Sequence, residues 1–180
     1  MEEYKINQEI ELNQSKKFPW GAAMIFAVVS FVLGVYAAVT VEAELGSDMI
    51  AGVSIFGGIG SLITGFIVAG VQYVFTKFPT QWISKEENVY KYDIWAAIFY
   101  SSAITSVLNV LIQQFNLQEN YIVSVLLNVA TTGLFLFFYF SGEEKERHVK
   151  KAMTIVQVVW LVLGLIIVIA GWMFVSSLEI

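Results

Sequence analysis

The ten Lys and Arg residues of this 180-residue chain lie in three short segments, separated by long apolar runs. The first segment precedes the first apolar run, the second lies between the second and third runs, and the third lies between the fourth and fifth. The connections after the first and third runs, and the C-terminal tail, contain acids but no bases. Because basic residues beside membrane spans are retained in the cytoplasm, this alternation predicts five spans, with the N-terminus inside and the C-terminus outside. The expected fold is all-α, an integral membrane bundle of five transmembrane helices.

The composition supports this class and argues against several others. Hydrophobic residues make up 57% of the chain and charged residues only 14%, which is unlike soluble domains. A formal net charge of −5 argues against a nucleic-acid partner, which would require a basic surface. The chain has no cysteine, so the sequence predicts no disulfide, no thiol nucleophile and no soft-metal site. Membrane lipids are the expected surroundings.

The chain divides into a polar cytoplasmic arm over residues 1–19, expected to be mostly disordered, and a membrane domain over residues 20–180. The expected spans cover approximately residues 20–41, 49–76, 94–115, 121–140 and 152–175, and about 20 residues suffice to cross a bilayer. Residues 77–93 form the longest expected internal loop, with Trp82 in a short segment that lies in the membrane interface. We expect the aromatic and aliphatic block 134–140 to face lipid.

Small residues recur at four-residue spacing in the first two spans. These are Ser30, Gly34 and Ala38 in the first span, and Gly57, Ser61, Gly65 and Ala69 in the second. Small side chains allow helix backbones to approach closely in lipid, where the hydrophobic drive for association is weak. We expect the two ridges to pack against each other within one chain. The alternative is that they form a face for a second copy or for a partner subunit.

Polar side chains inside the expected spans are few and uncharged, and four of them are candidate intramembrane sites: Asn109, Asn128, Thr132 and Gln157. Asn109 and Asn128 fall in the outer halves of adjacent helices, which predicts a hydrogen bond between these helices. Gln157 lies one turn before Trp160 and is a candidate partner for the indole N–H. The alternative is a substrate pathway around Asn109, Asn128 and Thr132.

The connection before the last span is rich in charge. Its basic side chains are candidate contacts for lipid headgroups or a partner: Lys145, Arg147, His148, Lys150 and Lys151. His148 is the only histidine and has no evident second ligand, so no metal site is expected there. The outer acids Glu42, Glu44 and Asp48 lack the spacing of a calcium loop. No catalytic motif occurs in the chain, and we predict no catalytic residue, no cofactor and no enzyme activity.

The order of these features resembles the Yip family, small five-span proteins named for their interaction with Ypt/Rab GTPases. The resemblance rests on the glycine-rich stretch from Gly57 to Gly70, which runs into Tyr73-Val74-Phe75, on the segment from Tyr92 to Tyr100, and on Lys151-Ala152. The N-terminal arm is shorter than in eukaryotic members, whose longer arms carry partner-binding segments. The resemblance therefore implies a bacterial-type relative. Such a protein would be an integral accessory protein, and some of these accompany ABC-type export systems.

Two functional hypotheses follow. The first is a non-enzymatic scaffold or accessory subunit of a bacterial plasma membrane. It would act through helix packing and cytoplasmic loops, with other membrane subunits or further copies of itself as partners. The alternative is a small transporter or channel subunit with a neutral polar pathway.

Overall fold

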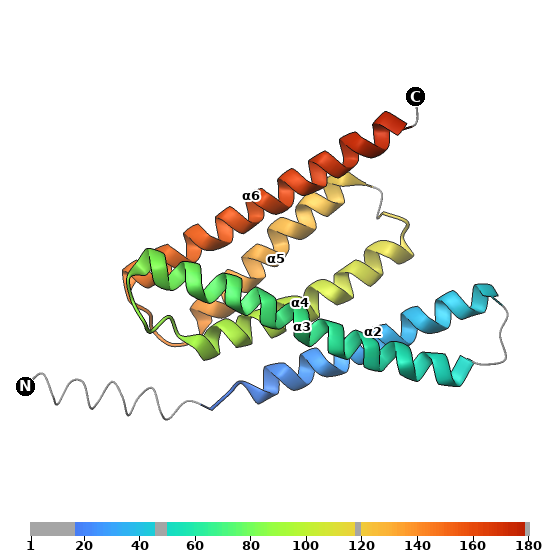
Figure 1. Cartoon of the computed structure of the whole chain (residues 1–180), viewed down its shortest axis with the longest axis horizontal. Coiled ribbons are helices and arrows are strands. Elements are labelled where there is room, and N and C mark those ends of the chain that lie inside the picture. Colours follow the sequence, from blue (N-terminus) through green and yellow to red (C-terminus); the bar gives the residue numbers. More distant parts are fainter. Residues whose placement is uncertain (1–16, 46–49, 118–119, 179–180) are drawn as a thin grey trace, which may run out of the picture.

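The computed structural model describes residues 17–45, 50–117 and 120–178, and within these ranges the ordered elements are five helices. They are α2 (Trp20–Leu45), α3 (Ile50–Ser84), α4 (Lys91–Gln114), α5 (Tyr121–Ser141) and α6 (Arg147–Leu178) (Figure 1). The predicted N-terminal arm lies almost wholly outside the described residues, as does Asp48.

All five helices are long and apolar enough to cross a membrane. The candidate spans are Trp20–Thr40, Ser54–Ser84, Lys91–Gln114, Tyr121–Ser141 and Arg147–Gly171. The prediction of an all-helical integral membrane protein with five spans is therefore confirmed.

Successive helices run in opposite directions, so the connections alternate between the two ends of the bundle (Figure 1). The start of α2, the α3–α4 connection and the α5–α6 connection lie at one end, which we call the basic end. Seven of the described bases lie in or beside these segments: Lys17, Lys85, Lys91, Lys145, Arg147, Lys150 and Lys151. The helical hairpins thus bring together basic segments that are distant in the sequence.

Helix α3 differs from its predicted extent. It continues through Pro79 to Ser84, so the connection to α4 covers only residues 85–90 and not 77–93. Trp82 accordingly lies on α3, on the continuation of the span. Proline lacks an N–H and normally breaks a helix, but in membrane helices a neighbouring side chain can bond the carbonyl that is left free. Helix α6 likewise begins earlier than expected, at Arg147, so that Lys150 and Lys151 are helical.

The first two helices approach closely at the small residues. An added Cβ at Gly57 would lie 2.6 Å from the Ala38 Cβ and 2.9 Å from the Gly34 carbonyl oxygen. One at Gly34 would lie 2.7 Å from the Gly57 carbonyl oxygen and would collide with the Ser61 side chain. These two ridges therefore face each other within the chain, at a separation that only small side chains permit.

Helix α4 contributes more buried apolar side chains to the core than any other helix, and Ile94, Ala97, Ile98 and Phe99 near the basic end are almost completely buried. In α5 the block 134–140 does not face lipid as a whole. Phe135 and Tyr139 are 1% and 0% exposed, while Phe137 is 64% exposed. Residues four apart share a helix face, so the block has one buried face and one lipid face.

Candidate functional site

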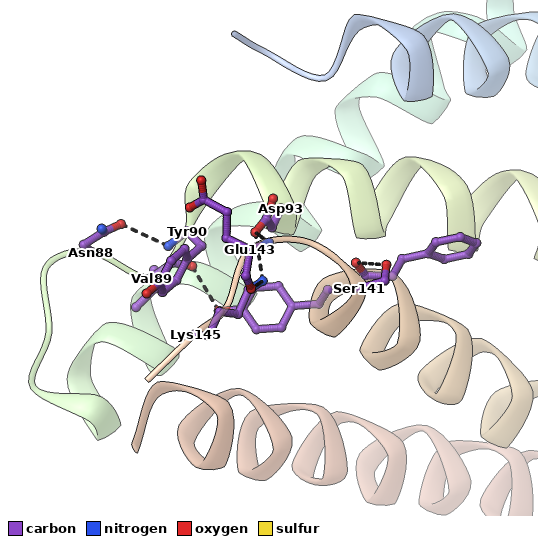
Figure 2. Close-up of polar contacts among 9 residues, drawn as sticks. Asn88, Val89, Tyr90, Asp93, Ser141, Glu143 and Lys145 are labelled. Atoms are coloured by element: carbon purple, nitrogen blue, oxygen red, sulfur yellow. Dashed lines mark hydrogen bonds and ion pairs between the residues drawn. The ribbon is translucent and has the colours of Figure 1, made fainter. Parts of the chain in front are cut away.

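The best-defined polar site is a buried ion pair at the basic end. The Lys145 ammonium group lies 2.8 Å from Asp93 Oδ2, and the two side chains are 0% and 14% exposed (Figure 2). Asp93 is in the first turn of α4, where the helix dipole favours a negative charge. Lys145 comes from the α5–α6 connection, so the pair fastens this connection to α4.

The same carboxylate also orders the backbone of the α5–α6 connection. The Glu143 N–H donates to Asp93 Oδ2 at 3.3 Å, and the Lys145 ammonium donates to the Glu143 carbonyl at 3.0 Å (Figure 2). A Cβ added at Gly142 would lie 2.6 Å from the Asp93 carboxyl carbon. Only glycine leaves room for the carboxylate at this position.

Two tyrosines surround the buried ammonium group. Lys145 Nζ lies 4.6 Å from the centre of the Tyr139 ring and 5.1 Å from that of Tyr90, distances that suit cation–π attraction. The Tyr139 hydroxyl donates to the Val89 carbonyl at 3.1 Å. A buried charge is costly unless it is paired and hydrogen-bonded, and here both conditions are met.

Tyr90 precedes α4 in a left-handed conformation, with φ 55° and ψ 59°. Its N–H donates to Asn88 Oδ1 at 3.2 Å, which stabilises this uncommon backbone geometry (Figure 2). Burial raises the pKa of the Tyr90 phenol, and the Glu146 carboxylate raises it further. The phenol is therefore neutral at physiological pH, and its ring is available to the Lys145 ammonium.

This geometry corrects the expectation for Lys145. A side chain that is 0% exposed and ion-paired within the chain cannot contact lipid headgroups. Arg147, His148 and Lys151 remain exposed, and Lys150 is half-buried. Sequence reasoning had missed Asp93, Tyr90, Tyr139 and Gly142, because no local signal links them to a lysine in another connection.

The prediction that His148 lacks a second ligand is also wrong. Its Nε2 lies 3.0 Å from Glu86 Oε1 and 3.3 Å from Glu146 Oε2, which makes an exposed cluster across two connections. One ligand atom from each residue lies within 4.8 Å of the others. Ligand atoms about 3.3 Å apart suit a tetrahedral zinc ion with bonds of roughly 2.0 Å. Within the part of the chain that the structure describes, these three residues could therefore hold a metal, although exposed acids commonly adopt such arrangements without one.

The predicted intramembrane polar residues lie apart from this site. Asn109 is exposed, and the Asn128 amide donates to the Ser124 carbonyl of its own helix at 2.9 Å. A side-chain hydrogen bond that does join α4 to α5 lies between Thr105 and Thr131, at 3.0 Å. The helices are thus joined by hydroxyls one turn closer to the basic end than the predicted pair. Thr132, the remaining candidate on α5, is half-buried.

Gln157 is not the partner of Trp160. The indole N–H donates to the Phe75 carbonyl of α3 at 3.2 Å. Gln157 is 5% exposed, and its amide nitrogen has no hydrogen-bond partner among the described residues. It lines a cavity of about 330 Å³ between α3 and α6, together with Gln72 and Thr76.

Comparison of the chain with protein-family models, with curated proteins and with solved structures gives no match. The chain is a five-span integral membrane protein with a buried ion pair at its basic end.

Proposed function

We propose that this protein is a non-enzymatic membrane scaffold or accessory subunit that presents the basic end to a partner. The observation that carries this proposal is the Lys145–Asp93 ion pair. It holds the α5–α6 connection against α4, so that the exposed charges around it form a defined surface. A preorganised surface lowers the entropic cost of binding.

The proposed orientation places the basic end in the cytoplasm of a bacterial plasma membrane, with the C-terminus outside. Its support is the gathering of the described basic segments at one end. The natural absence of cysteine permits a direct test. Asn116→Cys, at the opposite end, should react with a membrane-impermeant maleimide in intact cells, and Glu144→Cys should react only after lysis. The reverse pattern would overturn the orientation.

The resemblance to the Yip family leads us to propose a bacterial-type relative that accompanies another membrane complex, such as an ABC-type exporter. The alternative of a neutral pathway around Asn109, Asn128 and Thr132 has less support. Asn109 lies exposed and Asn128 bonds its own helix, whereas a pathway would need these side chains to line a common cavity.

The experiment is purification of the tagged full chain from its native membrane in a mild detergent, followed by mass spectrometry. We expect stoichiometric recovery of one membrane complex. Arg147→Glu, which reverses an exposed charge at the basic end, should reduce this recovery at least tenfold. Gln113→Glu, an exposed substitution on α4 near the opposite end, serves as the matched control and should retain it. Recovery of the protein alone would contradict the accessory role.

A further inference from the structure

A second polar feature is a partly open cavity that residues of α2, α3, α4 and α5 line. It has a volume of about 510 Å³, which is typical of small-molecule binding sites. Its polar lining residues include Ser30, Ser61, Thr64, Gln72, Ser102 and Ser106. All of these lie within the candidate spans.

Five of the hydroxyl groups that line this cavity differ from hydroxyls elsewhere in the helices, whereas two others in its wall, those of Thr105 and Thr131, bond each other at 3.0 Å. Serine and threonine in a helix commonly donate to a carbonyl three or four residues earlier. Thr40, Thr80, Ser101 and Thr154 all do so, with distances of 2.7–3.3 Å. Among the described residues, by contrast, the hydroxyls of the five lining serines and threonines named above make no hydrogen bond.

Ser30 and Gln72 are two of the polar residues in the wall of the cavity. Ser30 is 8% exposed, and its hydroxyl lines the cavity without a protein partner among the described residues. Gln72 is half-buried and lines both this cavity and the smaller one beside Gln157. Both side chains line the cavity, so an occupant that bonds their polar groups would gain hydrogen bonds within a membrane span, where water is scarce.

The chemistry of the wall defines the occupant. None of the lining residues carries a charge, so the wall offers no counter-ion to a charged ligand. Phe26 and Leu33 add apolar surface. The Phe26 ring packs against Phe66 and Phe99, with centroid distances of 5.4 Å in both cases. Phe26 precedes Ser30 by one turn on α2, so this aromatic cluster lies beside the cavity on the side of the start of α2.

We propose that this cavity binds an uncharged, hydroxyl-bearing molecule with a polar part of about glycerol size. The free hydroxyls would exchange hydrogen bonds with those of the ligand, and the Gln72 amide would supply both a donor and an acceptor. Two sources offer this chemistry: a small polyol from water, and a neutral monoacylglycerol from the bilayer. The site is independent of the docking role proposed for the basic end.

The experiment uses the full chain in nanodiscs and two probes. Glycerol binding is followed by saturation-transfer NMR, and 1-monooleoylglycerol binding by native mass spectrometry. The test variant is Ser102→Ala/Ser106→Ala, which removes two cavity hydroxyls with little change in volume. Ser101→Ala is the matched control, since Ser101 is the adjacent serine on α4 but donates to the Ile98 carbonyl at 3.3 Å.

We expect saturable binding of at least one probe, about tenfold weaker in the double variant and changed less than twofold in Ser101→Ala. Binding of glycerol would identify an aqueous source, and binding of monooleoylglycerol alone a membrane source. Absence of saturable binding of both probes, or equal binding by the double variant, would overturn the proposal. If the double variant does not fold, Gln72→Leu provides the same comparison.

Discussion

Trp160 on α6 donates its indole N–H to the carbonyl oxygen of Phe75 on α3, at a distance of 3.2 Å. Phe75 lies four residues before Pro79, so its carbonyl is the one that the missing proline N–H leaves without a helical partner. The two side chains also pack edge to face, with ring centroids 5.7 Å apart. One contact between helices thereby satisfies a backbone group in the membrane and allows α3 to continue to Ser84.

This relationship predicts coupling between Trp160 and Pro79. Trp160→Phe keeps an aromatic ring but removes the donor, and should lower the free energy of unfolding by about 1 kcal/mol. In a Pro79→Ala background the backbone N–H returns and can bond Phe75 itself, so the same substitution should cost clearly less. Unfolding in mixed detergent micelles would measure the double-mutant cycle. An equal cost in both backgrounds would contradict the assignment.

Lys145 should be essential to stability because its removal takes the buried Asp93 carboxylate's cationic partner away. We expect Lys145→Met to lower the free energy of unfolding by about 3 kcal/mol. Lys145→Met/Asp93→Asn should recover much of this loss, since no uncompensated charge remains. Lys151→Met, at an exposed position of α6, should have an effect within about 0.5 kcal/mol. A similar loss in both single variants would show that burial of the pair is not the cause.

Gly142 should tolerate no side chain. Its Cβ would lie 2.6 Å from the Asp93 carboxyl carbon, so Gly142→Ala must displace either the carboxylate or the connection. We expect a loss of roughly 2 kcal/mol in the free energy of unfolding. Gly133→Ala is the control, because no atom lies within 4 Å of its added Cβ and alanine favours the helix. If Gly142→Ala and Gly133→Ala shifted the midpoint of thermal unfolding by the same amount, the predicted collision at Gly142 would be refuted.

The close approach of α2 and α3 predicts a similar contrast. Gly57→Ala would place its Cβ 2.6 Å from the Ala38 Cβ and should lower the free energy of unfolding by about 2 kcal/mol, whereas Gly60→Ala meets no atom within 4 Å. Because Gly57 faces α2 of the same chain, the substitution should not change the oligomeric state measured by light scattering. A change in oligomeric state at constant stability would favour the alternative, a face between subunits.

The number of helices and the order of the hairpins could be predicted from the sequence, because hydropathy and charge are properties of short segments. Twenty apolar residues form a span whatever surrounds them, and bases mark its ends locally. The prediction of a loop over residues 77–93 was wrong because the end of α3 depends on a residue that is distant in the sequence. Whether Pro79 ends a helix depends on a donor supplied by Trp160, far away in the chain.

The functional side chains depended even more on tertiary structure. A spanning helix is apolar around most of its circumference, so its sequence alone does not indicate which face packs on another helix. Ser101 and Ser102 are adjacent serines that the sequence does not distinguish. In the structure the Ser101 hydroxyl donates to a carbonyl of its own helix, whereas Ser102 lines a cavity. The sequence predicts that Asn109 and Asn128 form the hydrogen bond between α4 and α5. The rotation of the two helices brings Thr105 and Thr131 together instead.

The sequence by itself thus determined the membrane class, the five spans and the clustering of bases at one end. Only the tertiary structure decided that Lys145 is a buried partner of Asp93 and not a surface base. The two residues lie 52 positions apart, and their pairing results from how the α5–α6 connection packs against the start of α4. Hydropathy and charge are properties of the residues in each segment of the sequence. The rotation of each helix and the contacts between connections arise only when the helices pack.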